Sequence, residues 1–285
     1  MPAESHVGVV IPCYDDGATL AETVASVLGQ TKEVVVVDDG STDAHTLDVL
    51  ARLETEGIHV VRGPNRGVAA ARMSGVHATS APYVFPLDAD DLAEPGALAA
   101  LAAALDEHPE AAVAFGYVRT FGTYSYVSKF LPRLDPWLLT YMNHLPSASL
   151  IRRSALLEAG GWRSGIYHED WDLWLALAER GWTGIRVPRL AVHYRVHRGR
   201  RWAETNRHYE EIVAGFCRDH EALFRARREN WRRSRAPWRL KLALPIVDRL
   251  PLLRAYDKRR IGELVRRPLR VTRLALSVRA ASARR

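Results

Sequence analysis

The first hundred residues alternate short apolar runs with segments whose apolar residues repeat at helical spacing. Continuous apolar runs at 7–11 and 34–37 predict strands that are covered on both faces, and the spacing between them predicts a helix. Further strands are expected at 59–62, 83–87 and 111–115, with helices near 67–78 and 95–106. This alternation indicates an α/β protein with a mostly parallel sheet flanked by helices. Its ligand site is expected at the carboxyl ends of the strands.

The regular spacing stops from about 117 to 147, where the chain is rich in aromatic residues. A loop-rich region of this length inside a compact domain is more often functional than idle. Beyond it, we expect strands at 148–151, 183–187 and 191–196, a helix that ends at Gly160-Gly161 and a helix at 169–180. From about 202 the pattern predicts helices broken by Pro237, Pro245, Pro251 and Pro268. We therefore expect a catalytic or binding domain over 1–200 and a basic helical extension over 201–285.

The charge is distributed unevenly. Residues 1–197 hold 15 Lys and Arg against 24 Asp and Glu, whereas residues 198–285 hold 25 against 9, so the net charge of +7 comes from the extension. Three interpretations of the extension stay open: a solvated helical appendage, a contact with an anionic membrane, or an arm that binds nucleic acid. Apolar residues among its Arg and Lys favour an interfacial amphipathic segment: Trp231, Trp238, Leu240, Leu242, Leu244, Ile246 and Val247. No recognition motif accompanies the charge, which disfavours nucleic acid.

Cysteine content and the amino terminus bear on the cellular compartment. Cys13 and Cys217 are too few for a disulfide framework, which favours a reducing compartment. The first six residues lack the basic and apolar regions of a signal peptide, and no stretch approaches the ~18 apolar residues of a membrane span. These features predict a cytoplasmic protein that is able to rest on the inner face of a membrane.

The segment 84–91, VFPLDADD, places three carboxylates after an apolar run. In an extended chain, residues i and i+2 point to the same side, so Asp88 and Asp90 are expected to converge outside the strand end. A divalent cation there would offset their repulsion, and Mg²⁺ or Mn²⁺ takes one or two carboxylates together with phosphate oxygens. The plainer alternative is that Asp90 or Asp91 caps the helix that begins near Pro95.

Two further polar motifs follow predicted strands. In the segment 38–43, DDGSTD, aspartates at a strand end can accept hydrogen bonds from a nucleoside, while Ser41 or Thr42 can cap the chain that follows. Arg66 precedes a helix amino terminus, where a guanidinium and free N–H groups favour an anion such as a diphosphate. A surface arginine is the plainer explanation of Arg66.

A third acidic motif, HEDWDLW at 168–174, opens the helix expected at 169–180. Residues two positions apart on a helix are turned by about 200° from each other, so Asp170 and Asp172 cannot both face one cavity. One of them is expected to be structural. Trp171 and Trp174 share a stripe, which favours core packing. For Trp171, a platform for a sugar is the alternative.

Together these motifs resemble the family 2 glycosyltransferases with the GT-A fold. The matching segments are VIPCY at 10–14, VVVDDGSTD at 35–43, NRG at 65–67, LDADD at 87–91, SLIRRS at 149–154, GGW at 160–162 and EDWDLW at 169–174. They follow the family's order and spacing over roughly residues 6–197. One departure is Asp15, because the family often has asparagine after the tyrosine.

The resemblance implies an inverting glycosyltransferase that moves a sugar from a nucleoside-diphosphate donor to an acceptor hydroxyl on a glycan, a lipid-linked molecule or a small molecule. The implied donor-binding residues are Pro12, Tyr14, Asp38, Asp39, Arg66, Asp88, Glu169 and Arg195. The implied ligands of Mg²⁺ or Mn²⁺ are Asp90, Asp88 and His197, with His193 a weaker candidate. Asp170 would be the general base, and Trp171 with the 117–147 region would shape the acceptor pocket.

The implied chemistry explains why these residue types are needed. A metal held by Asp90 would stabilise the negative charge that grows on the departing diphosphate, while the Asp170 carboxylate would take the acceptor proton from the opposite side of the sugar. Two alternatives stay open. One is a catalytically silent nucleotide-sugar-binding protein, against which the presence of both carboxylates argues. The other is a metal-dependent phosphohydrolase or nucleotidyltransferase, which would not need the Glu169-Asp170 pair.

Overall fold

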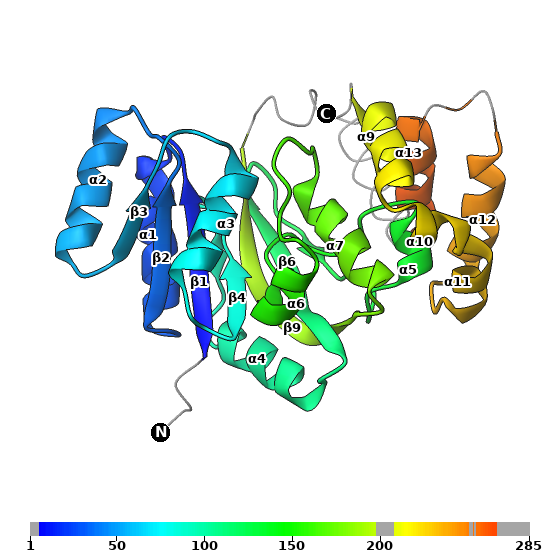
Figure 1. The fold of residues 1–285 in the computed structure, drawn as a ribbon, viewed down its shortest axis with the longest axis horizontal. Coiled ribbons are helices and arrows are strands. Elements are labelled where there is room, and N and C mark those ends of the chain that lie inside the picture. The colour runs from blue at the N-terminus through cyan, green and yellow to red at the C-terminus, as the bar shows by residue number, and fades with distance from the viewer. Residues whose placement is uncertain (1–5, 198–207, 251–252, 254, 267–285) are drawn as a thin grey trace, which may run out of the picture.

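The computed structural model describes residues 6–197, 208–250, 253 and 255–266. Its strands are β1 (Val7–Cys13), β2 (Glu33–Asp38), β3 (His59–Arg62), β4 (Tyr83–Pro86), β5 (Leu92–Ala93), β6 (Ala111–Gly122), β7 (Val127–Ser128), β8 (Leu150–Arg152) and β9 (Thr183–Val196). Within these residues they form a single sheet of order β3-β2-β1-β4-β8-β6-β9-β5, with β7 paired to β6 (Figure 1). The pairs β1–β2, β2–β3, β1–β4 and β6–β9 are parallel, and β8 lies antiparallel between β4 and β6. The pairs β5–β9 and β6–β7 are antiparallel as well. The predicted α/β sheet flanked by helices is confirmed, and the sheet is mixed rather than mostly parallel.

The helices fall into two groups along the chain. Those that accompany the sheet are α1 (Gly17–Leu28), α2 (Ala44–Thr55), α3 (Val68–Ala78), α4 (Ala97–Glu107), α5 (Pro136–Leu139), α6 (Arg153–Glu158) and α7 (Glu169–Glu179). Those of the basic extension are α9 (Tyr209–Asp219), α10 (Glu221–Arg225), α11 (Arg227–Arg233), α12 (Trp238–Asp248) and α13 (Ala255–Arg266). The extension lies at one end of the molecule, beyond α5 and α7 (Figure 1). No helix of the described residues has the length and apolarity to cross a bilayer.

Alternate side chains of β1 enter two different hydrophobic cores. Val10 packs with residues of α3, α6 and α7, whereas Val9 and Ile11 pack with residues of α1, α2 and α4. Successive residues of a strand point to opposite faces, so helices on both sides require apolar residues at every position. This double coverage explains the uninterrupted apolar run, and it leaves the strand ends as the place for polar groups.

Several element boundaries differ from the sequence-based expectation. The strands expected at 183–187 and 191–196 are one strand, β9, because its 14 residues pair along the 12-residue β6 through register shifts near Tyr117. The region 117–147 is correspondingly less irregular than expected, since it contains the end of β6 and the helix α5. Helix α2 was not predicted, and Asp43 rather than Ser41 or Thr42 caps it, through the N–H of Thr46.

The prolines act differently from the expectation. Helix α4 begins at Ala97, after Gly96 in a left-handed conformation at φ 72°, so Pro95 lies outside the helix. Pro245 lies inside α12 without ending it, and Pro237 is the N-cap of that helix. Pro251, Pro268 and the expected boundary at residue 200 lie outside the described residues.

The extension shares its core with the sheet domain. Tyr209, Ile212 and Phe216 of α9 belong to the hydrophobic cluster that contains α7. Leu240 and Leu244 of α12 belong to a second cluster, with Trp137, Leu138 and Met142. The buried face of α12 therefore packs against the segment around α5, and the extension is built onto the domain rather than tethered to it.

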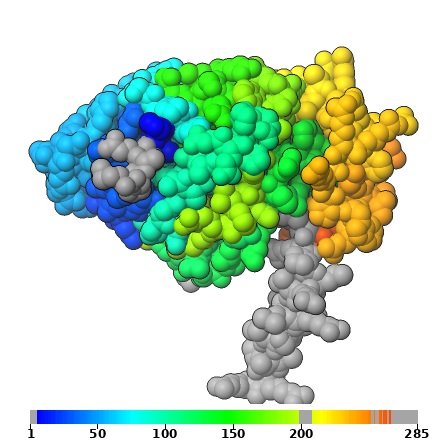
Figure 2. Space-filling view, turned by 90° about the horizontal axis from the view of Figure 1, so that it is seen from below, coloured from blue at the N-terminus to red at the C-terminus, as the bar shows by residue number. Residues whose placement is uncertain are grey.

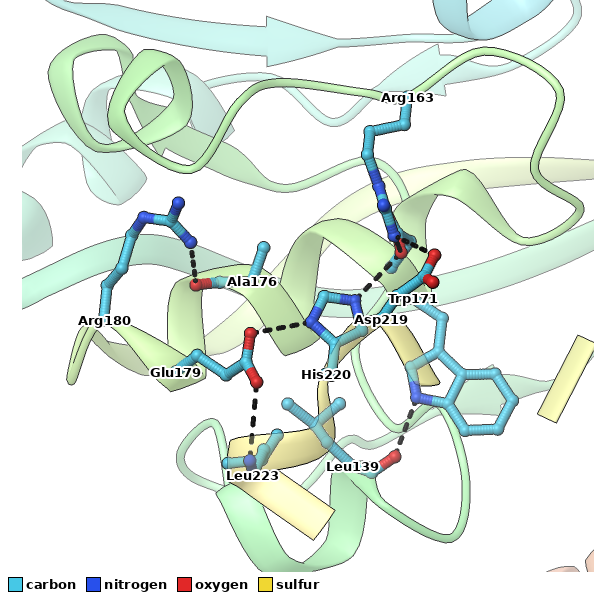
Figure 3. Close-up of polar contacts among 10 residues, drawn as sticks. Leu139, Arg163, Trp171, Ala176, Glu179, Arg180, Asp219, His220 and Leu223 are labelled. Atoms are coloured by element: carbon cyan, nitrogen blue, oxygen red, sulfur yellow. Dashed lines mark hydrogen bonds and ion pairs between the residues drawn. The ribbon is translucent and has the colours of Figure 1, made fainter. Parts of the chain in front are cut away.

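A buried polar network joins α7 to the extension. The His220 ring lies between two carboxylates, with Nδ1 2.9 Å from Glu179 Oε2 and Nε2 3.0 Å from Asp172 Oδ1 (Figure 3). Arg163 Nε also donates to Asp172 Oδ2 over 2.7 Å. Burial lowers the pKa of His220, but the hydrogen bonds to Asp172 and Glu179 outweigh it and raise the pKa above its usual value. Helical geometry predicted that one of Asp170 and Asp172 is structural, and these contacts give Asp172 that role.

Candidate active site

The acidic segment 88–91 forms a turn after β4 instead of continuing the strand. The N–H of Asp91 donates to the backbone oxygen of Asp88 over 3.0 Å. The expected i, i+2 alternation therefore does not apply, and Asp88 and Asp90 take different partners. Neither Asp90 nor Asp91 caps α4, whose N-cap is Gly96. The plainer interpretation of this motif, a helix cap, is wrong.

Asp90 lies beside His197. Asp90 Oδ2 is 2.8 Å from His197 Nε2, which joins the turn after β4 to the end of β9. The Asp90 carboxylate is partly buried, and the imidazole is exposed. The structure thus brings together two of the residues expected to hold a metal ion, although they are 107 positions apart in the chain.

Asp91 is the buried member of the turn. Its Oδ1 accepts a hydrogen bond from the backbone N–H of Arg195 over 2.8 Å. Burial, the largest cause, and the charges of Asp88 and Asp90 together raise the pKa of Asp91 to about 9. The raised pKa thus reflects mainly the removal of this carboxyl from water.

Arg195 supports this turn from within the protein. Its Nε donates to the backbone oxygen of Asp90 over 2.8 Å, and its Nη2 donates to Glu22 Oε2 over 2.6 Å. Two nitrogens of the guanidinium are thus engaged by protein groups, so Arg195, which was expected to bind the donor, holds the turn that carries Asp90. His193 is also engaged, with Nε2 2.5 Å from Glu94 Oε2.

Arg72 of α3 is a site residue that the sequence reasoning missed. Its side chain is 3% exposed, and the guanidinium joins two acidic motifs: Nη2 is 2.7 Å from Asp88 Oδ1 and Nη1 is 2.6 Å from Glu169 Oε1. Burial opposes its charge, but the two carboxylates outweigh that effect and raise its pKa. Arg72 follows buried Ala69 by three residues and precedes buried Val76 by four, so helical spacing was the signal for a buried arginine.

Asp170 lies in the first turn of α7, next to the carboxylate that binds Arg72. Its Oδ2 accepts a hydrogen bond from Asn143 Nδ2 over 2.8 Å. Burial, the largest cause, and the charge of Glu169 raise the pKa of Asp170 to about 6, against the opposing effect of Arg72. Asn143 was not predicted individually, but it belongs to the 117–147 region that was expected to shape the site. A carboxylate in this setting loses its proton close to neutral pH.

Trp171 is a core residue, which corrects its expected place at the acceptor pocket. Its side chain is 3% exposed, Nε1 donates to the backbone oxygen of Leu139 over 2.8 Å, and its ring lies 5.0 Å from that of Phe216. Trp174 is fully buried, as expected. Helix α9 covers the face of α7 that carries Trp171, and the local pattern of α7 gives no sign of that cover.

Asp39 fixes the loop that leads into α3. Its two carboxylate oxygens accept hydrogen bonds from the N–H groups of Arg66 and Gly67, each over 2.8 Å. These two N–H groups are therefore engaged. We had expected them to be free to bind an anion, and that expectation is wrong. The Arg66 side chain is exposed. Asp38 is buried beside them, and its Oδ1 accepts the N–H of Ser41 over 2.9 Å.

The residues after β1 lie next to the loop after β2. Pro12 is buried within β1, opposite Val37 of β2, whereas Tyr14 beyond the strand is exposed. Asp15 adopts a left-handed conformation at φ 55°, and its Oδ1 accepts the N–H groups of Thr42 over 2.7 Å and Asp43 over 2.9 Å. Asp15, the departure from the family pattern, therefore orders the loop after β2.

The side chains at the turn after β4 fit a divalent cation whose remaining ligands are the phosphate oxygens of a bound donor. In the part of the chain that the structure describes, no three His, Cys, Asp or Glu side chains converge as a metal-binding group. Mg²⁺ and Mn²⁺ commonly take only one or two protein ligands when phosphate oxygens complete the shell. Asp90 and His197 supply such a pair, whereas Asp88 Oδ1 is already taken by Arg72.

Comparison with known proteins decides the family. Residues 8–157, more than half of the chain, match the glycosyl transferase family 2. The chain belongs to that family. The matched segment contains the loops after β1, β2 and β4 and helix α3, whereas the Glu169-Asp170 pair and the extension lie beyond it.

Relatives agree with this assignment and identify the chain as a glycosyltransferase. An uncharacterized glycosyltransferase of Mycobacterium tuberculosis is 32% identical over 208 residues, which are 67% of this chain and 86% of the relative. One of Haemophilus influenzae is 27% identical over 199 residues, covering 63% and 71%. Among solved structures, S. aureus TarS 1–349 in complex with UDP-GlcNAc matches with a TM-score of 0.59 at 17% identity, covering 83% of this chain and 70% of that one. The last likeness shows the fold, and the expected family resemblance is confirmed.

Proposed function

We propose that this glycosyltransferase moves a sugar from a nucleoside-diphosphate donor to an acceptor hydroxyl with inversion, assisted by Mg²⁺ or Mn²⁺. The solved TarS structure contains UDP-GlcNAc, which supports a nucleotide-sugar donor for a chain of the same fold. The observation that carries the proposal is the Arg72 bridge, because one buried guanidinium contacts both Asp88 of the acidic turn and Glu169 beside Asp170. The turn proposed to hold the donor and the helix end that carries the proposed base Asp170 are thereby held next to one another.

Asp170 is the general base in this proposal. The first turn of a helix favours the ionised form of a carboxylate, and Asn143 fixes the direction of the Asp170 side chain through Oδ2. With a pKa of about 6, Asp170 is mostly ionised at neutral pH and still basic enough to take the proton of an acceptor hydroxyl. Attack from the face of the sugar opposite the diphosphate inverts the anomeric centre. Asp170 then keeps the proton while the diphosphate leaves.

The turn after β4 holds the diphosphate end of the donor. Asp90 and His197 would bind the metal ion, and a divalent cation there stabilises the negative charge that develops on the leaving oxygens. Arg195 and Arg72 position this turn through the Asp90 backbone and the Asp88 side chain. Because the cation neutralises the leaving group, no second carboxylic acid is needed to protonate it.

The loops after β1, β2 and β3 are proposed to hold the nucleoside. Tyr14 supplies an exposed ring from the loop after β1, and Arg66 an exposed guanidinium from the loop after β3. Asp15 and Asp39 link these two loops to the loop after β2 through backbone N–H groups. Pro12 and Asp38 are buried beneath these loops and support them. The carboxyl ends of parallel strands are where open α/β sheets bind nucleotides.

The test is donor binding followed by transfer. UDP-, GDP- and dTDP-sugars are screened with Mn²⁺ for a rise in the melting temperature, since a ligand that binds only the folded state stabilises it by mass action. Asp90→Ala should abolish the Mn²⁺-dependent rise, and Asp170→Asn should keep the rise but lose transfer. Asp48→Ala, an exposed carboxylate of α2, is the matched control and should behave as the wild type.

Two outcomes would contradict this function. If Asp90→Ala retains both donor stabilisation and turnover, the acidic turn is not the donor site. If Asp170→Asn hydrolyses the donor as fast as the wild type and no acceptor is ever glycosylated, the protein is a phosphohydrolase and the base assignment is wrong.

A further inference from the structure

Helix α12 exposes three large apolar side chains to solvent. Trp238 is 70% exposed, Leu242 56% and Ile246 61%, which is unusual for residues of this size. They follow one another at intervals of four residues, so each is turned by about 40° from the one before, and the three form one stripe along the helix. We call these three residues the α12 stripe.

The α12 stripe is not the core-facing side of the helix. Leu240, Leu244 and Val247 are buried, and at about 100° per residue they centre on the side of α12 opposite the stripe. The structure therefore divides the apolar residues of this segment into two sets, one that packs on the domain and one that the described residues leave exposed. Only the second set is available to a partner.

Positive charge surrounds the α12 stripe. Arg239 and Lys241 lie on either side of it at helical spacing, and Arg249 follows α12. Residues 227–250 hold 8 Lys and Arg against 2 acidic residues. Trp231 of α11 extends the apolar surface, because its Nε1 donates to the backbone oxygen of Lys241 and its ring lies 4.7 Å from Lys241 Nζ.

We propose that the α12 stripe is a docking surface for an anionic lipid bilayer, with α12 lying in the plane of the headgroups. An apolar stripe flanked by Arg and Lys, with Trp at its border, has the chemistry of an interfacial helix: the apolar side chains enter the acyl boundary and the cations bind anionic headgroups. Helix α12 lies at the outer end of the molecule, the end away from α1 and α2 (Figures 1 and 2).

Charge favours this partner over a second copy of the chain. Self-association through the same surface would bring two basic patches together, and juxtaposed like charges oppose binding. Anionic headgroups offset the same charges. The stripe belongs to a different part of the molecule from the Asp90 and Asp170 site, so membrane docking and sugar transfer can be tested separately.

Vesicle sedimentation of the full chain tests the proposal. The wild type should sediment with vesicles of phosphatidylcholine and phosphatidylglycerol and stay in solution with phosphatidylcholine alone. The triple variant Trp238→Ser, Leu242→Ser, Ile246→Ser should lose binding by about tenfold or more, because the surface no longer has an apolar part. Its melting temperature and its donor-induced stabilisation should match the wild type, which separates failure of docking from failure of folding or of the proposed function.

A matched control replaces exposed apolar residues elsewhere. Leu28→Ser, Leu47→Ser, Leu157→Ser alters side chains of α1, α2 and α6 and should leave vesicle binding unchanged. The proposal is overturned if the wild type does not bind anionic vesicles, or if the α12 variant binds them as the wild type does. It is also overturned if the α12 variant loses a concentration-dependent dimer in sedimentation velocity but keeps vesicle binding, because a second copy would then be the occupant.

Discussion

Arg72 Nη2 lies 2.7 Å from Asp88 Oδ1, and through Nη1 the same buried guanidinium reaches Glu169. Removing the cation leaves two carboxylates without their partner, and breaking a buried ion pair costs about 3–5 kcal/mol. We therefore expect Arg72→Gln to lower the free energy of unfolding by roughly that amount in urea denaturation. Arg72→Lys should recover only part of it, because one ammonium cannot reproduce the two-pronged guanidinium contact. Wild-type stability in Arg72→Gln would contradict this role.

The activity should fall on the acidic side as Asp170 takes up a proton. Burial raises the pKa of Asp170 to about 6, and only the ionised form can accept a proton, so the rate should rise with pH through about 6 and then level off. Asp170→Asn should lose about 10²-fold or more of kcat, the usual contribution of a general base. The measurement is kcat against pH at saturating donor.

Two neighbours of Asp170 should move this pH profile in opposite directions. The charge of Glu169 raises the pKa of Asp170 and the charge of Arg72 lowers it. Glu169→Gln should thus shift the acidic limb of the profile to lower pH, and Arg72→Gln should shift it to higher pH. A purely structural role for both residues would reduce the rate without moving the limb.

His220 should make stability depend on pH. Its folded-state pKa is raised above the ordinary 6.5 by the hydrogen bonds to Asp172 and Glu179, so the folded protein holds this proton more tightly than the unfolded chain. The resulting stabilisation is fully present below pH 6.5 and is lost as the pH rises through the folded-state pKa. Thermal unfolding across this range should show the loss in the wild type and in His45→Gln, an exposed control on α2. In His220→Gln this contribution should be absent.

Asp15 should tolerate the residue that the family prefers. The N–H groups of Thr42 and Asp43 both donate to the single atom Oδ1, which asparagine also has, and asparagine readily adopts a left-handed backbone. Asp15→Asn should therefore change the free energy of unfolding by less than about 0.5 kcal/mol. Asp15→Ala should cost about 1 kcal/mol, because two exposed hydrogen bonds to Oδ1 are exchanged for hydrogen bonds to water. Equal stability of the two variants would show that this loop does not depend on Oδ1.

Much of the fold and the chemistry could be predicted from the sequence. The apolar runs of β1 and β2 locate a doubly covered sheet, because alternate side chains must enter cores on both faces. The acidic motifs at 88–91 and 169–170 indicate the two halves of the candidate site, since their carboxylates need a compensating cation or a partner. Helical geometry alone also predicts that the side chains of Asp170 and Asp172 point to different sides of their helix.

Contacts between residues that are far apart in the chain could be found only in the tertiary structure. The Arg72 bridge, the Asp90–His197 contact and the cover of Trp171 by α9 join residues that are far apart in sequence. Local periodicity reports which face of an element is apolar, but not which element covers that face. For α12 this distinction separates Leu240, which packs on the domain, from Trp238, which faces solvent. Which element covers a face depends on how distant segments pack together, and a pattern within one segment does not contain that information.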